Sequence, residues 1–252
     1  MDTTITITFG ECVENHAGMQ QIGNKSNIGL SVDELKEAKT KIEQCGVKVD
    51  VELIHLNQYN KGEGDEAAIL IIRQGANALL HEYNNEQGAN ALLHEYNDVK
   101  WDTKAKMKGR VVNKRARFNI CMADESQTAN YEEGKGTVVS FDDLPLTKKI
   151  RALLPLWFGE KTNNLNAEGN YYYNNNCFIG FHGDFERRIV VAIRLGKSMP
   201  LYYQWYHHCK PVGERCDLML HHGDMYIMSD KAVGHDWKKS SLLTLRHAAN
   251  YK

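Results

Sequence analysis

Short runs of aromatic and β-branched residues, separated by Gly, Asn and Pro, fill the chain from about Trp101 to its end. Such runs are typical of strands and their separators are typical of turns. Leu146 to Phe158 has helical spacing instead. The predicted strands are Arg117 to Met122, Gly136 to Phe141, Tyr171 to Tyr173, Phe178 to His182, Ile189 to Leu195, Leu201 to Tyr206, Asp217 to His221, Met225 to Met228 and Leu242 to Arg246. Many short strands joined by tight turns predict a sandwich or a barrel.

The first hundred residues follow another pattern, which predicts a small α/β module. Thr3 to Phe9 alternates threonine with isoleucine or phenylalanine, the period of a half-buried strand. Ser31 and Glu34 form a capping box at the start of a predicted helix. Val47 to Leu56 and Ala67 to Arg73 predict two more strands. The sequence therefore predicts two units, residues 1–100 and residues 101–252.

An identical peptide, QGANALLHEYN, occurs at Gln74 to Asn84 and again at Gln87 to Asn97. Two copies do not make a solenoid, which needs at least about three repeats of about 20 residues or more. The spacing of the copies is close to a whole number of helical turns, so both would present the same face of one extended helix. His81 and His94 are then predicted to be surface residues rather than ligands.

Composition argues against several classes of protein. The six cysteines form no CxxC pair, which argues against a disulfide framework and a zinc ribbon. No apolar run approaches the ~20 residues that cross a bilayer, and no secretory signal opens the chain, so we expect an intracellular protein without a membrane partner. A formal net charge of -1 makes no general case for nucleic acid, although the stretch from Lys104 to Arg117 is locally basic.

The segment from Phe178 to Asp184 carries the residues that most clearly indicate chemistry. His182 and Asp184 are two positions apart at a predicted strand edge, so their side chains lie on one face. A distant histidine would complete a 2-His-1-carboxylate triad, whose open positions suit Fe(II), a chelating cosubstrate and O2. His235 follows a predicted strand and is the expected third metal ligand.

Arg246 is the predicted anchor for the cosubstrate. It stands eleven residues beyond His235, a spacing that fits two adjacent, antiparallel final strands. Its guanidinium offers the bidentate fork that matches the distal carboxylate of 2-oxoglutarate.

With these motifs the chain resembles the AlkB-like branch of the Fe(II)/2-oxoglutarate-dependent dioxygenases over roughly residues 105–250. That family's pattern of Asn-x-Tyr, Ile-Gly-x-His-x-Asp and Leu-Thr-x-Arg is matched by Asn170 to Tyr172, Ile179 to Asp184 and Leu243 to Arg246. By that resemblance Asn170 and Tyr172 would hydrogen-bond the cosubstrate. Relatives carry a second arginine where this chain has Ser240, so the cosubstrate clamp is altered.

The resemblance implies an α+β fold in which a double-stranded β-helix, or jelly-roll, occupies residues 101–252 behind the α/β module. It implies an iron dioxygenase that uses Fe(II), 2-oxoglutarate and O2 to hydroxylate or oxidatively demethylate a substrate. The expected substrate is a modified nucleobase in DNA or RNA, with Arg187, Arg188 and the basic stretch at phosphates, although those arginines could equally be solvated charges. The alternatives are a hydroxylase of a protein side chain or small metabolite, and a non-catalytic binding or adaptor protein on the same fold.

Overall fold

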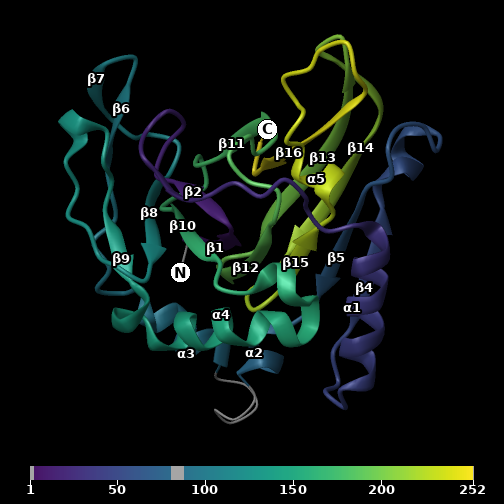
Figure 1. Cartoon of the computed structure of the whole chain (residues 1–252), viewed down its shortest axis with the longest axis horizontal. Helices are drawn as coiled ribbons and strands as arrows, with labels where there is room; N and C mark the ends of the chain where they lie inside the picture. The colour runs from purple at the N-terminus through teal and green to yellow at the C-terminus, as the bar shows by residue number, and fades with distance from the viewer. Residues whose placement is uncertain (1–2, 81–87, 252) are drawn as a thin grey trace.

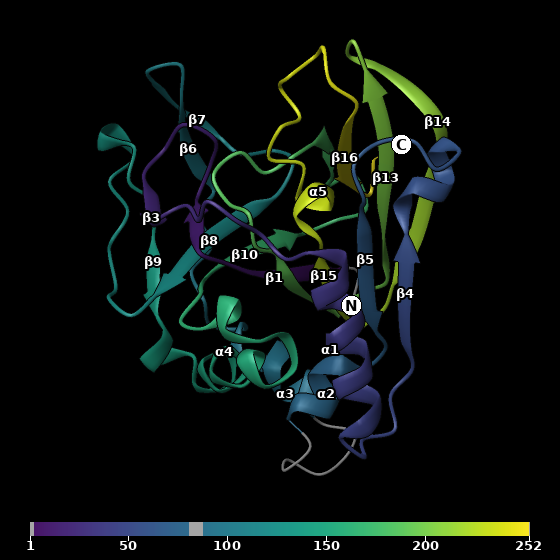
Figure 2. The ribbon, with the colours of Figure 1, turned by 45° about the vertical axis from the view of Figure 1, so that its right-hand side comes forward.

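The protein is a mixed α/β structure in which most elements are strands and few are helices (Figures 1 and 2). The computed structural model describes residues 3–80 and 88–251. The eight-stranded sheet contains, in spatial order, β4 (Val51–His55), β5 (Ala68–Ile72), β15 (Met225–Met228), β12 (Val191–Gly196), β1 (Thr4–Gly10), β10 (Asn166–Tyr172), β8 (Phe118–Ala123) and β9 (Val138–Ser140). The four-stranded sheet contains β11 (Ile179–His182), β16 (Thr244–Ala249), β13 (Met199–His207) and β14 (Lys210–Leu220).

Two short hairpins and five α-helices complete the part of the chain that the structure describes. The hairpins pair β2 (Cys12–Glu14) with β3 (Gln21–Gly23), and β6 (Lys104–Met107) with β7 (Arg110–Asn113). The helices are α1 (Val32–Gln44), α2 (Gly75–Leu79), α3 (Gly88–Glu95), α4 (Pro145–Phe158) and α5 (Asp230–Val233). Short 3-10 turns lie at Leu56–Asn60, Tyr131–Glu133, Phe141–Asp143 and Glu160–Thr162. Among the described residues, no helix is both long and apolar enough to cross a bilayer.

From β10 onward the chain passes back and forth between the two large sheets, with one hairpin, β13–β14, inside the smaller sheet. β10, β12 and β15 lie in the eight-stranded sheet, whereas β11, β13, β14 and β16 lie in the four-stranded sheet. The place between β10 and β12 is taken by β1, which pairs antiparallel with both. β4 and β5 extend the same sheet beyond β15. The predicted boundary near residue 100 therefore runs through one hydrogen-bonded sheet, because strands from both predicted units share it.

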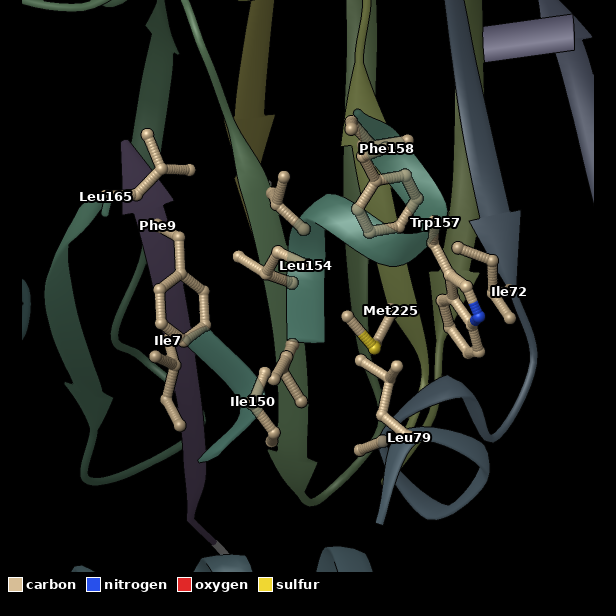
Figure 3. Close-up of a cluster of buried hydrophobic side chains, with 14 of the residues drawn as sticks. Ile7, Phe9, Ile72, Leu79, Ile150, Leu154, Trp157, Phe158, Leu165 and Met225 are labelled. Carbon is tan, nitrogen blue, oxygen red and sulfur yellow. The ribbon is translucent and has the colours of Figure 1, made fainter. Parts of the chain in front are cut away.

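The alternation of side chains along the strands separates two cores. On β1, Ile5, Ile7 and Phe9 face the helices, whereas Thr6 and Thr8 face the other way. Figure 3 shows the helix side, where Ile150, Leu154 and Trp157 of α4 pack among residues from β1, β5 and β15. The opposite face of the large sheet packs on the small sheet through a second core, which includes Ile71, Ala192, Tyr203, Trp205 and Leu245. The helices thus cover one face of the large sheet and the small sheet covers the other.

Several predicted elements are confirmed. The strand from Thr3 to Phe9 is β1, and the helix from Leu146 to Phe158 is α4. The capping box of α1 is present, with the Ser31 side chain accepting from the Glu34 backbone and the Glu34 side chain accepting from the Ser31 backbone.

The prediction of one extended helix across the duplicated segment is wrong. α2 ends at Leu79, and Leu80 leaves helical geometry. A Cβ on Gly88, at the start of α3, would lie 2.9 Å from the Leu80 Cβ, so α2 and α3 do not follow one another along a single helix axis. Leu80 and Leu92 are both buried in the same core, which includes residues of α4. His94 is exposed as predicted, whereas His81 lies outside the described residues.

Candidate metal centre

Two imidazoles and one carboxylate converge between the sheets. In the described part of the chain, His182, Asp184 and His247 are the group whose ligand atoms all lie within 4.8 Å of one another. His182 ends β11 and is the cross-strand partner of His247 on β16. The Asp184 Oδ1 atom lies 3.4 Å from His182 Nε2 and 3.6 Å from His247 Nε2. The donor set is that of a 2-His-1-carboxylate iron site.

The backbone around the centre orients these groups. The His182 Nδ1 atom lies 2.8 Å from the Gly180 carbonyl oxygen, and as the donor in this bond it leaves Nε2 free for a metal. The Asp184 backbone N–H donates to the Val233 carbonyl oxygen of α5. Both ring Nε2 atoms and the carboxylate therefore face one point.

Neighbouring charged and hydrogen-bonding groups favour the ionised form of Asp184, which is the form that binds a metal. Burial acts to raise the pKa of Asp184, but the Arg187 guanidinium and the two histidines outweigh it and hold that pKa well below its usual range. Burial lowers the pKa of His247, assisted by the neighbouring His182. Asp184 is thus ionised and His247 neutral at neutral pH.

Gly183, between the two ligands of the HxD motif, is fixed by a close approach to α5. A Cβ at this position would lie 2.0 Å from the Gly234 carbonyl oxygen, which is backbone and cannot turn away. A Cβ on Gly180, in contrast, would make an ordinary contact of 3.6 Å with Tyr251.

We expect Gly183→Ala to displace Asp184 from His182, to lower the free energy of unfolding by about 1–3 kcal/mol and to abolish metal binding. Thermal unfolding and a Mn(II) titration followed by electron paramagnetic resonance measure the two effects. Gly180→Ala is the matched control and should behave as the native chain. Normal Mn(II) affinity in Gly183→Ala would show that the contact with Gly234 does not hold the ligands.

The structure does not bring His235, the predicted third ligand, to this group. His235 follows α5 and its Nδ1 atom lies 3.7 Å from Asp230 Oδ1, in a separate surface hollow that also includes Asp236 and Lys239. The prediction is corrected to His247, because the last strand carries the third imidazole and the α5 turn carries His235 away.

Arg246 also lies elsewhere than predicted. It precedes His247 on β16, so the two side chains point to opposite faces of the strand. Its guanidinium lies over the rings of Tyr206 and Trp237, with centroid distances of 4.1 and 5.3 Å. The sequence predicted that His235 and Arg246 lie on two paired strands, whereas in the structure only Arg246 lies on a strand, β16. Because His247 on β16 faces the cavity, the adjacent Arg246 faces away from it.

Arg194 is the arginine that faces the centre. It lines the same cavity of about 270 Å³ as His182, Asp184 and His247, and it is 1% exposed. Its Nη1 atom donates to Thr6 Oγ1 of the adjacent β1, whereas its Nε atom is buried without a partner. A buried guanidinium with an unused donor fits a carboxylate ligand.

Asn170 and Tyr172, the other predicted cosubstrate residues, do line this cavity from β10. The Asn170 amide is already engaged, because it donates to Glu168 and accepts from Arg117. Tyr172 is buried at 4% exposure. Their predicted contact with a cosubstrate stays a prediction.

Arg187 and Arg188, which were expected at phosphates, are occupied by carboxylates. The Arg187 Nη2 atom donates to Glu168 at 2.7 Å, and its Nε atom lies 3.4 Å from Asp184 Oδ2. Arg188 forms an ion pair with Asp230. Both arginines therefore stabilise the protein's own acidic groups.

His247 and Arg194 were not predicted as site residues, although the sequence pattern around each of them indicates burial. His247 lies in phase with Leu245 and Ala249, which alternate toward the core, whereas Arg246 lies out of phase. Arg194 interrupts the apolar run from Val190 to Leu195, where a buried charge requires a partner or a ligand. The residues that alternate toward the core along each strand therefore indicate which polar side chains also face inward.

Comparison with known proteins finds a viral relative of similar length. The chain is 48% identical over 250 residues to "Uncharacterized protein R156" of Acanthamoeba polyphaga mimivirus, in an alignment that covers 97% of this chain and 94% of that protein. The chain belongs to the family of this viral protein. No family model matches the chain. Because the alignment spans nearly both chains, the relative covers the strands that supply His182, Asp184, Arg194 and His247.

Proposed function

We propose that the protein is an Fe(II)/2-oxoglutarate-dependent dioxygenase. The observation that carries the proposal is the convergence of His182, Asp184 and His247 from separate parts of the chain. The alternation of strands between two sheets supports it, because this winding is that of a double-stranded β-helix, or jelly-roll. In this assignment β1 supplies the strand that closes the larger sheet, between β10 and β12.

The residues present fit both the metal and the cosubstrate. Two imidazoles and a carboxylate are the donors that Fe(II) takes in such sites, and they leave coordination positions open. Arg194 would hold the distal carboxylate of 2-oxoglutarate, since it lines the cavity and its buried Nε atom has no partner there. Thr6 would hold the guanidinium in place through its hydroxyl oxygen.

When bound, the iron with 2-oxoglutarate and O2 would supply the oxidising power, in a reaction that releases succinate and CO2. The chain's own residues orient the reactants and exclude water. His182 and His247 are fixed by strand pairing, and Asp184 by the α5 backbone. The buried Tyr203 and Tyr226 stand around the centre in the core between the sheets.

Two substrate classes are candidates. The sequence resemblance favours a modified nucleobase in DNA or RNA, and the β6–β7 hairpin supports it because Lys104, Lys108 and Arg110 are exposed there. A small metabolite or a protein side chain is the alternative. It is supported by the cavity of about 270 Å³, which lies at the small end of ligand sites, roughly 300–1,000 Å³.

Succinate release from 2-oxoglutarate, with and without Fe(II), tests the proposal. We expect iron-dependent release by the native chain and none above background by Asp184→Ala. Asp98→Ala, which removes an exposed carboxylate, is the control and should match the native chain. Equal release by native protein and Asp184→Ala would remove the enzymatic function and leave a binding or adaptor role on the same fold.

A further inference from the structure

A group of carboxylates lines the cavity beside the metal centre. Glu14 ends β2, Glu168 lies on β10, and Glu186 lies two residues beyond Asp184. β2 packs against β10, which brings Glu14 within electrostatic reach of the other two glutamates. The wall next to the iron ligands is therefore acidic.

One buried guanidinium, that of Arg187, pairs with two of these three carboxylates. The Arg187 side chain is 4% exposed, and its Nη2 atom lies 2.7 Å from Glu168 Oε2 and 2.6 Å from Glu186 Oε1. Within the described residues no ion pair joins Glu14, whose hydrogen-bonding neighbour is the neutral amide of Gln21. Glu14 is thus a half-buried carboxylate that forms no ion pair in the described part of the chain, and Arg187 acts on it only at longer range.

The environment of Glu14 opposes its negative charge. Burial, followed by repulsion from Glu186, raises the pKa of Glu14 to about 7. Burying a charged group without a partner is unfavourable, and a ligand that brings the opposite charge relieves that penalty. The cavity's other cations have contacts of their own: Arg194 donates to Thr6, Arg117 donates to Asn170, and the Lys238 ammonium lies 4.7 Å from the Phe185 ring centroid.

We propose that the substrate places a compact cationic group, a guanidinium, against the carboxylates of Glu14 and Glu186. This inference rests on the proposed function, because it names the substrate class of the same cavity. The cation would sit between two carboxylates that now repel each other, and its N–H groups would donate bidentate or bridging hydrogen bonds to them. The volume of the cavity, about 270 Å³, limits the size of the substrate group. Because the same cavity must also hold 2-oxoglutarate, the space that remains fits a group of the size of an amino acid.

Calorimetric titration with arginine and citrulline tests the proposal, because citrulline replaces the guanidinium by a neutral urea of similar shape. N-acetylarginine amide, which lacks both backbone charges, distinguishes a peptide side chain from a free amino acid as the source. Titrations use the full chain, metal-free and loaded with Mn(II) and 2-oxoglutarate. In the Mn(II) form, relaxation of the probe's δ-methylene protons places the bound probe near the metal, with the Zn(II) form as the diamagnetic reference.

We expect arginine to bind roughly 10- to 100-fold more tightly than citrulline, the range for a hydrogen bond between charged groups. Glu14→Gln should bring the affinity for arginine down to that of citrulline. Glu37→Gln makes the same chemical change on the exposed face of α1 and should leave the preference intact. Glu14→Gln removes an unpaired buried charge, so it should fold at least as stably as the native chain, which a thermal unfolding curve checks.

Equal affinity for arginine and citrulline would overturn the inference, as would an undiminished preference in Glu14→Gln. Tight binding of a single-stranded oligonucleotide with no preference for arginine over citrulline would assign the cavity to a nucleobase instead. The two proposals fail separately. Mn(II) binding without cation preference leaves the metal centre standing, whereas cation preference in a chain that binds no metal leaves the cation site standing without the oxygenase.

Discussion

Replacing His247 by alanine is expected to reduce iron-dependent succinate release by more than about 100-fold, whereas His235→Ala keeps it within about twofold. The reason is geometric. His247 Nε2 lies 3.6 Å from Asp184 Oδ1 inside the cavity, and His235 lies beside Asp230 in a separate surface hollow. Loss of a group that only orients a metal ligand already costs about 10- to 100-fold, so loss of the ligand itself costs more.

The pair of variants separates the two histidines directly. Succinate is measured by proton NMR at saturating Fe(II), and Mn(II) affinity is measured on the same samples by electron paramagnetic resonance. Both variants should fold, which near-ultraviolet circular dichroism checks. A large loss in His235→Ala with an unaffected His247→Ala would reverse the assignment and would require α5 to turn inward on metal binding.

Arg194→Met is expected to raise the KM for 2-oxoglutarate by about 30-fold to more than 1000-fold, with Arg246→Met close to the native value. Removing one partner of a buried, hydrogen-bonded charge pair costs about 2–5 kcal/mol, and each 1.4 kcal/mol, approximately, is a factor of ten. Arg194 is buried in the cavity with its Nε atom unpartnered. Arg246 lies on the other face of β16, over Tyr206 and Trp237.

A third variant tests the geometry of the anchor. Arg194→Lys keeps the positive charge but loses the planar fork, so its KM should lie between those of the native chain and Arg194→Met. Initial rates against 2-oxoglutarate concentration give KM and kcat for all three proteins. If Arg246→Met raises KM while Arg194→Met does not, the cosubstrate binds outside this cavity and the proposed orientation is wrong.

The N-terminal strand shows what local pattern can and cannot reveal. The alternation in Thr3 to Phe9 predicted a strand correctly, with isoleucine and phenylalanine on the buried side. Nothing local indicated that this strand pairs with β10 and β12, whose residues lie more than a hundred positions away. Hydrogen-bond partners in a sheet are set by the whole arrangement, since any strand offers the same backbone groups.

In the candidate site, too, some residues could be predicted from local sequence and others could not. The short spacing of His182 and Asp184 is a local property, and the two side chains do lie together in the structure. The histidine that joins them comes from a strand 63 residues beyond Asp184 (247 minus 184), whereas chain order pointed to His235. Strand phase would have favoured His247, which alternates with Leu245 and Ala249.

By itself the sequence determined many of the elements, the HxD pair and the strand-rich character of the protein, because these depend on side-chain periodicity and on residues close together in the chain. Only the tertiary structure decided that β1 completes the large sheet, that His247 meets His182 and Asp184, and that Arg194 rather than Arg246 faces them. The physical reason is that each of these depends on which faces of distant strands are buried together. Burial of that kind follows from packing the two sheets and the helices as a whole.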